Sequence, residues 1–319
     1  MLCSAHSPWY KVVIIMKRNK FIGVECIPTG KASDNITDGC IVVEGGGFRG
    51  VYSAGVMDAL MENDINMSCL VGVSAGALNG LNYISGQIGR STRINLNFRQ
   101  DDRYVGAKAF KTDNGIIGFS YLFNEINDYE PFDFDRFNNS PQRFVSVVTN
   151  CLTGETEYFE KGKCDDILQG VRASATLPYV SKPVFIDDTP YFDGGCSCKL
   201  PYQWAIDNGF KKIIVVKNQH ESFRFDNYLN LNMIIELSYR NYPNLSQALA
   251  EGDERYNNQC NEIAKLSKSK DIFVFSPSKK LKIDTLENDL SKLIKLYFLG
   301  YNDTKKRLRE LKTYLYGGE

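Results

Sequence analysis

The stretch CIVVEGGGFRGVYSAGV, residues 40–56, passes from a β-branched apolar run to three consecutive glycines and then to a second apolar segment. A short β-branched run is typical of a buried strand, and the small and apolar residues that follow are typical of a helix. The glycines between them would let other groups approach the backbone closely. This stretch therefore predicts a strand, a glycine-rich turn and a helix, which is a unit of an α/β fold.

The same alternation continues along most of the chain. The expected strands are Cys40–Glu44, Cys69–Val73, Phe144–Thr149, Lys212–Val216 and Asp271–Phe275. The expected helices are Val51–Met61, Ala75–Ser85, Asp165–Ala173, Pro201–Asn208 and Ser246–Ser267. Residues 89–140 are polar, aromatic and irregular, so we expect an insertion of loops and short helices there. The pattern predicts the α/β class, with a mostly parallel central sheet flanked by helices.

The two ends of the chain are expected to differ from this central part. Residues 1–38 look like a poorly structured leader, and translation could start at Met1 or at Met16. The apolar run at residues 12–15 is too short for a membrane span. Residues 221–319 are expected to hold the rest of the sheet and a C-terminal helical extension. Its leucines predict a helical hairpin, with residues 302–304 (Asn-Asp-Thr) as the cap of the second helix.

Composition excludes several function classes. Lys plus Arg and Asp plus Glu number 38 each, so no overall charge favours nucleic acid as a partner. Nine cysteines, an odd number without repeated Cys-x-x-Cys pairs, indicate reduced thiols and a cytoplasmic protein. With only His6 and His220, a two-histidine zinc site is hardly possible. We therefore expect neither a metal nor another cofactor.

The segment CLVGVSAGALNG, residues 69–80, contains the pattern Gly-x-Ser-x-Gly as Gly72-Val73-Ser74-Ala75-Gly76. An apolar strand is expected before it and a helix after it. A serine on such a strand-to-helix elbow sits in a strained turn that lifts its hydroxyl clear of the sheet, and small flanking residues are needed there. Ser74 is therefore a candidate nucleophile.

The glycine run at residues 45–47 then acquires a possible function. Attack of Ser74 on an ester carbonyl would place negative charge on the carbonyl oxygen, and backbone N–H groups of Gly45, Gly46 and Gly47 could stabilise it. Arg49, followed by Gly50, would either fix this loop or contact an anionic group of the substrate, and we favour the first role. The alternative is a phosphate-binding loop of a nucleotide binder, but neither common nucleotide fingerprint is present.

A serine nucleophile needs a base. The segment TPYFDGGCSCKLP, residues 189–201, offers Asp193 in front of Gly194 and Gly195, a tight turn that could present a carboxylate. By itself the segment would be read as a hairpin turn. His220, just after an expected strand, is an alternative base of the kind found in ordinary hydrolase triads.

The three segments together, in this order, resemble the patatin-like phospholipase family. The family's anion-hole loop corresponds to residues 45–50, its nucleophile elbow to residues 72–76 and its Asp-Gly-Gly motif to residues 193–195. VRASATLPYV, residues 171–180, is similar to a further segment of the family. The resemblance implies a three-layer catalytic domain over residues 39–220, with the C-terminal extension packed on it.

The resemblance also implies a Ser74–Asp193 dyad without histidine, an acyl-enzyme intermediate and an oxyanion hole that includes the N–H of Ala75. The implied substrates are lipid esters, namely phospholipids, lysophospholipids or acylglycerols, with transient contact to a membrane surface. Acyl transfer through the same intermediate and non-catalytic lipid binding are the alternatives. Residues 115–123 (GIIGFSYLF) could line the acyl channel, cover it as a lid, or simply pack in the core.

Overall fold

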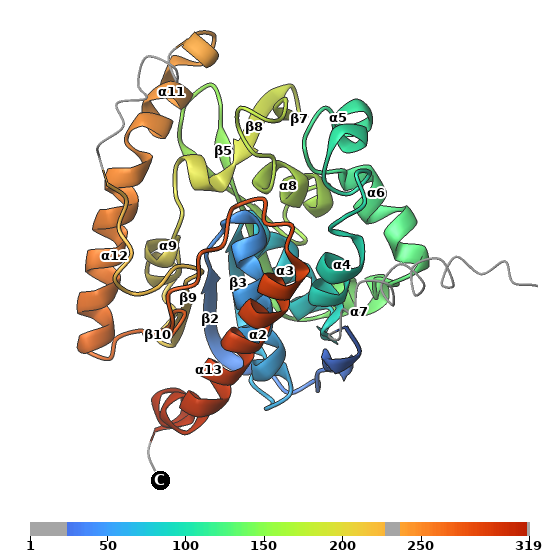
Figure 1. Ribbon diagram of the computed structural model, residues 1–319. Coiled ribbons are helices and arrows are strands. Elements are labelled where there is room, and N and C mark those ends of the chain that lie inside the picture. The colour runs from blue at the N-terminus through green and yellow to red at the C-terminus, as the bar shows by residue number, and fades with distance from the viewer. Residues whose placement is uncertain (1–23, 227–236, 318–319) are drawn as a thin grey trace, which may run out of the picture.

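The computed structural model describes residues 24–226 and 237–317, and one large β-sheet forms its centre (Figure 1). In sheet order the strands are β10 (Phe273–Phe275), β9 (Ile213–Val216), β2 (Thr37–Val43), β3 (Met67–Val73), β5 (Arg143–Asn150), β8 (Thr189–Asp193) and β7 (Val184–Ile186), and β6 (Thr156–Glu160) also pairs with β5. Neighbours from β10 to β5 are parallel, whereas β6, β7 and β8 are antiparallel to their partners.

The five strands expected from the sequence form the parallel part of this sheet, so the prediction of a mostly parallel sheet is confirmed. Their apolar runs fit, because parallel strands are buried on both faces; all four residues of β9 are buried, for example. The sequence did not reveal β6, β7 and β8. These are short or only partly buried, and β8 contains Pro190, a residue that is rare within strands.

Helices surround the sheet (Figure 1). They are α2 (Val51–Met61), α3 (Ala75–Ile84), α4 (Arg90–Phe98), α5 (Ala107–Asp113), α6 (Phe119–Phe123), α7 (Phe134–Asn139), α8 (Ile167–Ser174), α9 (Tyr202–Asp207), α11 (Pro243–Ala250), α12 (Gly252–Lys268) and α13 (Leu290–Tyr316). Within the described ranges, none of them combines the length and apolar character needed to cross a bilayer.

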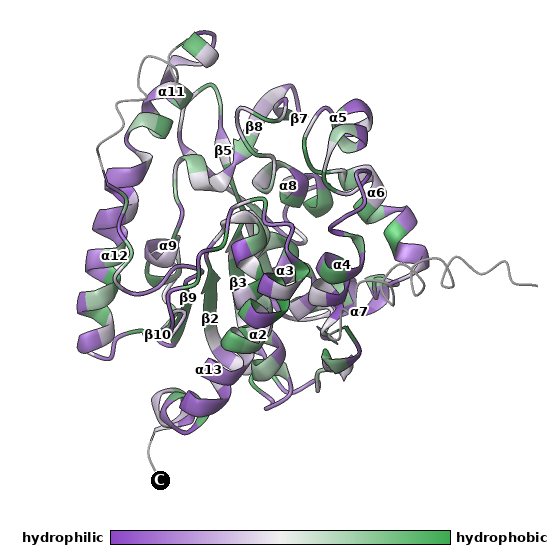
Figure 2. Cartoon of the chain, in the orientation of Figure 1, coloured by the Kyte–Doolittle hydropathy of each residue, from purple (hydrophilic) through white to green (hydrophobic). Residues whose placement is uncertain are grey.

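The helices form layers on both faces of the sheet. Alternate residues of β2 point to opposite faces, as in any strand. Ile41 and Val43 belong to the core that includes α2, α3 and α13, whereas Cys40 and Val42 belong to the core that includes α9 and α12. In Figure 2 the central strands β2 and β3 are hydrophobic, and much of α12 is hydrophilic. The fold is therefore a three-layer α/β fold, as predicted.

The insertion expected at residues 89–140 consists of α4 to α7 with loops and one 3-10 turn, Glu125–Asp128. The predicted leader, residues 1–38, lies outside the described residues up to residue 23. The rest of it differs from the prediction, because Ile27 is buried and Gly30–Lys31 pairs as β1 with β4 (Gln87–Ile88). The central sheet also begins earlier than expected, at Thr37.

The expected C-terminal hairpin is wrong, because α13 continues without a break through residues 302–304. The polar residues that suggested a helix cap have other partners. Asp303 accepts hydrogen bonds from the backbone N–H and the hydroxyl of Ser278, at 2.9 and 2.6 Å, and Thr304 donates to the carbonyl of Gly300 at 2.9 Å. Asp303 therefore ties α13 to the segment that contains Ser278, and the Thr304 bond lies within the helix, so neither residue ends it. The expected helix over residues 246–267 is divided at Glu251 into α11 and α12.

Candidate active site

The pairing of β5 brings Ser74 and Asp193 to one place. Val73, the last residue of β3, pairs with Val147 of β5, and Asp193, the last residue of β8, pairs with the next residue, Val148. Val147 and Val148 also pair with β6, which therefore occupies one edge of β5. The end of β3 and the end of β8 then lie one after the other along the other edge of β5. The two strands run toward each other and end at the same point. Ser74 follows β3 immediately, which sets its side chain beside the carboxylate of Asp193.

Ser74 forms the expected strand-to-helix elbow between β3 and α3. Its φ of 56° and ψ of −121° are unusual for a residue other than glycine, as expected for such a turn. Its backbone N–H donates a hydrogen bond to the hydroxyl of Ser174 at 2.8 Å. The flanking glycines are required by close packing, since a Cβ atom on Gly76 would lie 2.4 Å from the carbonyl oxygen of Val43, and one on Gly72 would lie 2.6 Å from Gly76.

Asp193 is a buried carboxylate with few partners. Burial raises its pKa to about 6, although a hydrogen bond with the Ser74 side chain, another from the N–H of Gly195 at 2.7 Å and the charge of Lys199 act in the opposite direction. Gly194 and Gly195 begin a single 3-10 turn, Gly194–Cys196, that follows β8 directly. The turn presents the carboxylate to the serine in a form that can take up a proton near neutral pH.

The glycine loop lies beside the serine. A Cβ atom on Gly45 would lie 2.9 Å from the Cβ atom of Ser74. Gly46 and Gly47 have φ values of 128° and 59°, a backbone conformation that favours glycine. Gly47 and Ala75 are the first residues of helical turns, where N–H groups lack a helical acceptor. Within the described ranges, the structure gives no acceptor for the N–H groups of Gly46, Gly47 or Ala75.

A buried hydrogen-bond network fixes the start of the glycine loop. Asn218, just after β9, donates its side-chain amide to the carbonyls of Glu44 and Gly45 at 2.7 and 3.0 Å, and its backbone N–H donates to the Glu44 carboxylate. Burial raises the pKa of Glu44, and the buried cation of Lys217 opposes this most. The network ties the loop to the carboxyl end of β9.

Arg49 contributes to the same loop. Burial lowers the pKa of this guanidinium, and the nearby Glu44, Tyr256 and Asp284 raise it again. Arg49 lines neither of the cavities at Ser74, so its position favours the loop-fixing role over contact with the substrate. Gly50 packs closely on α3, where a Cβ atom on it would come within 2.6 Å of the Ala75 side chain.

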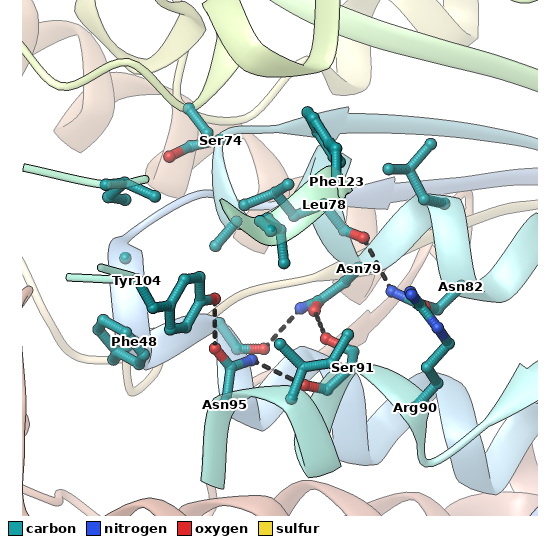
Figure 3. Close-up of a pocket in the computed structure, with 18 of the residues that line it drawn as sticks. Phe48, Ser74, Leu78, Asn79, Asn82, Arg90, Ser91, Asn95, Tyr104 and Phe123 are labelled. Carbon is teal, nitrogen blue, oxygen red and sulfur yellow. Dashed lines mark hydrogen bonds between the residues drawn. The ribbon is translucent and has the colours of Figure 1, made fainter. Parts of the chain in front are cut away.

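Two cavities meet at Ser74. One, of about 220 Å³, is lined by Asp193, Gly46 and Lys199, and we call it the dyad cavity. The other, of about 80 Å³, is mostly apolar and extends between α3 and α4; we call it the apolar pocket (Figure 3). Ser74 and Leu177 line both. An ester bound at the serine would therefore extend in two directions, into chemically different spaces.

The apolar pocket is walled by segments from distant parts of the chain. Ile117, Leu122 and Phe123, from the segment expected to line an acyl channel or to pack in the core, line this pocket. Phe119 of the same segment packs in the core. The segment therefore contributes both to the pocket wall and to the core, and its role toward an acyl chain stays a prediction. Leu286, from the segment before α13, closes another part of the wall.

The polar side chains of the apolar pocket bond mainly to one another (Figure 3). Tyr104 donates to the Asn95 side chain at 3.0 Å, and Arg90 donates to the Asn82 side chain at 2.8 Å. Ser91 donates to the side chain of Asn79 in the same way. Because these groups already have partners, the pocket offers a ligand chiefly apolar contact.

His220 does not reach the site. Its ring nitrogen Nδ1 lies 3.0 Å from the hydroxyl of Ser222, and it lines neither cavity. Sequence reasoning missed the roles of three residues, Ser174, Lys199 and Asn218. Asn218 could have been suspected from its place after a parallel strand, where α/β sites gather. Nothing in the sequence singles out Lys199.

Comparisons with known proteins give a family for most of this architecture. Residues 41–206 match the model of the patatin-like phospholipase family, and residues 242–316 match a domain of unknown function, DUF6363. The second region, which includes α11 to α13, also contributes β10 to the central sheet. It is thus joined to the first through the sheet.

Three curated relatives share part of this sequence. The uncharacterized protein YjjU of Escherichia coli is 27% identical over 56% of this chain and 51% of its own length. Lysophospholipase NTE1 of Scheffersomyces stipitis is 27% identical over 66% of this chain and 13% of its own length. The probable lipid hydrolase 463L of Invertebrate iridescent virus 6 is 24% identical over 67% of this chain and 82% of its own length.

The chain spans about half the length of the first of these relatives, 51% of YjjU. The family match itself covers more than half of the 319 residues and contains the glycine loop, the serine elbow and Asp193. This chain therefore belongs to the patatin-like phospholipase family.

Proposed function

We propose that this protein is a lipid acyl-ester hydrolase in which Ser74 is the nucleophile and Asp193 the general base. The observation that carries the proposal is the meeting of β3 and β8 along β5, which places a serine in a strained elbow beside a buried carboxylate in a cavity. Family membership agrees with it, as do relatives named lysophospholipase and probable lipid hydrolase.

In this mechanism Asp193 accepts the proton of the Ser74 hydroxyl while Oγ attacks the ester carbonyl carbon. The tetrahedral intermediate collapses, the bond to the alcohol oxygen breaks, and Asp193 returns its proton to that oxygen. Water then attacks the carbonyl carbon of the acyl-enzyme while Asp193 takes its proton. The bond to Ser74 Oγ breaks, Asp193 returns the proton to Oγ, and the fatty acid leaves. The pKa of about 6 suits both roles, because the carboxylate is ionised at neutral pH and still basic enough to accept a proton.

The backbone provides the electrostatic part of the proposal. Negative charge on the carbonyl oxygen would be held by the N–H groups of Gly46, Gly47 and Ala75 near the serine, and Gly47 and Ala75 also start helical turns. Asn218 acts indirectly, by fixing the position of the loop. We assign Arg49 the same kind of indirect role.

The two cavities suggest how the substrate is placed. The lining of the apolar pocket matches the chemistry of a fatty acyl chain, because its polar groups are already bonded to one another. The alcohol that leaves would occupy the dyad cavity, because Asp193 must reach its oxygen. Such substrates reside in membranes, so we propose a cytoplasmic enzyme that contacts the membrane surface transiently.

The test uses the whole chain and a Ser74→Ala variant. We expect the wild type to react with a fluorophosphonate probe and to release fatty acids from a mixed lipid extract, as followed by mass spectrometry. Ser74→Ala should lose labelling and at least about 10³-fold in rate. Ser267→Ala, on α12 away from both cavities, is the matched control. Full activity of Ser74→Ala would refute the proposal.

A further inference from the structure

We propose that the dyad cavity recognises a phosphodiester on the leaving alcohol and that Lys199 is the residue that binds it. This inference rests on the proposed function and deepens it. It selects phospholipids and lysophospholipids as substrates over neutral acylglycerols. Lys199 is then a specificity-determining residue of the site.

The position of Lys199 is the first reason. It lies in the loop that follows Asp193 and its side chain lines the dyad cavity, close enough to act on the charge of that carboxylate. Among the described residues that line this cavity, Lys199 is the only cation. The other charged groups there, Asp193 and Glu44, would repel an anion, so a cation is what an anionic ligand requires in this space.

The partners of Lys199 are the second reason. Its ammonium group has three N–H donors. It makes one long hydrogen bond of 3.3 Å to the carbonyl of Gly252 and one ion pair of 3.9 Å with the exposed carboxylate of Asp253, and it lies 5.4 Å from the centre of the Phe225 ring, which accepts no conventional hydrogen bond. An ion pair of that length at the surface contributes little stability. Lys199 therefore keeps donors for a ligand.

Arg90, the cation of the apolar pocket, shows the contrast. It donates to the side chains of Asn82 and Asn127, both at 2.8 Å, and to the carbonyl of Glu130. Its donors are occupied by the protein, whereas those of Lys199 are largely available. The two cavities thus differ in the charge that they can offer to a ligand, and the difference favours an anion in the dyad cavity.

The direction of the reaction is the third reason. Asp193 must protonate the alcohol oxygen that leaves, so the alcohol half of the substrate occupies the cavity that Asp193 lines. In a phospholipid this half carries the phosphate, close to the ester that is cleaved. In a monoacylglycerol the same half is uncharged. A cation beside the leaving group therefore distinguishes the two classes.

The experiment measures kcat/KM of the wild type and of Lys199→Gln on lysophosphatidylcholine and on monoacylglycerol with the same acyl chain. Loss of one charge-assisted hydrogen bond should lower the ratio of lysophospholipid to monoacylglycerol activity about 10- to 100-fold. Lys199→Arg should restore most of the ratio. Lys265→Gln, an exposed position on α12, is the matched control.

Assays at pH 8 separate this effect from the titration of Asp193. Lys199 lowers the pKa of that carboxylate, so Lys199→Gln should also move the acid limb of the pH profile to higher pH for both substrates. At pH 8 the carboxylate is ionised in either protein. A purely structural role of Lys199, or an effect of its charge on Asp193 alone, would then affect both substrates equally. Thermal unfolding of each variant shows that it is folded.

A competition experiment identifies the source of the phosphate. Glycerophosphocholine should inhibit the wild type and not Lys199→Gln, and inorganic phosphate should inhibit much less. Equal inhibition by both would overturn the assignment to a lipid head group. An unchanged substrate ratio in Lys199→Gln would overturn the inference while leaving the proposed function intact. Activity in Ser74→Ala, by contrast, would refute the proposed function itself.

Discussion

Asp193 at the candidate active site and Asp58 in α2 are buried carboxylates with closely matching surroundings. Each accepts one backbone N–H and faces one hydroxyl group. Asp193 has the N–H of Gly195 at 2.7 Å and the hydroxyl of the elbow serine, and Asp58 has the N–H of Gly89 and the hydroxyl of Tyr297, both at 2.9 Å. Burial raises the pKa of Asp193 to about 6 and that of Asp58 to about 7.

The difference lies in what surrounds each pair. Asp58 joins α2 to α13 inside the core through its hydrogen bond from Tyr297, and it lines neither of the two cavities at Ser74. Asp193 opens onto the dyad cavity, and its partner Ser74 has a strained backbone beside free N–H donors. A raised pKa is thus common to a structural and a chemical site. The site of Asp193 differs from that of Asp58 in having space for a ligand and a nucleophile beside the carboxylate.

The largest effect should come from removing the base. Asp193→Asn keeps the size and the hydrogen bond from Gly195, but the amide cannot accept the proton of Ser74. We expect kcat to fall by about 10²- to 10⁴-fold. Because burial of the charge costs stability, the variant should be at least as stable as the wild type at pH 8. Ester hydrolysis and denaturant unfolding measure the two quantities.

The corresponding change at the second aspartate tests the comparison directly. Asp58→Asn should hydrolyse esters at the wild-type rate, within about twofold, since Asp58 touches neither cavity. A loss as large as that of Asp193→Asn would show that the two sites are coupled. Asp58 could then not be regarded as a purely structural carboxylate. Normal activity in Asp193→Asn would also contradict the comparison, because it would show that Asp193 takes no part in the reaction.

The pH dependence of the wild type should give the next effect. Asp193 must be ionised to act as a base, so kcat/KM should fall tenfold per pH unit below an apparent pKa of about 6 and be level above it. The titration of Asp58 near pH 7 should leave no break in this profile. An apparent pKa near 7 in the kcat/KM profile of the wild type that moved to near 6 in Asp58→Asn would contradict the assignment of this titration to Asp193.

Sequence reasoning located the parts of the site that lie next to one another in the chain. The elbow at Ser74 has fixed local requirements, and the five buried parallel strands are marked by apolar runs such as residues 69–73. The pairing that brings Asp193 to Ser74 depends on β8, a five-residue strand containing Pro190, which carries almost no local signal. From the residues alone Asp193 was one of two candidate bases, and the resemblance to a family is what favoured it over His220 before the structure did.

Contacts between distant segments were beyond the sequence for a physical reason. A polar residue such as Asp303 is compatible both with a helix cap and with a buried tertiary contact, and local propensity cannot choose between them. Lys199 is similar, since a lysine after a turn is usually exposed to solvent. Its place in the dyad cavity depends on how the loop after β8 meets the start of α12.

The smallest effect concerns the stability of the fold around Asp58. The pKa of Asp58 is about 7 in the folded protein and 3.8 in its reference state, so the native state binds more protons between these values. Stability should therefore decrease as the pH rises through this range. In Asp58→Asn the amide keeps an acceptor for Gly89 and can donate to the Tyr297 hydroxyl, so that part of the pH dependence should vanish. We expect the difference in unfolding free energy between wild type and variant to change by about 1–4 kcal/mol from pH 5 to pH 8, measured by denaturant unfolding. An equal slope in both proteins would mean that Asp58 is not the group that titrates, and the match between the two aspartates would then extend to geometry alone.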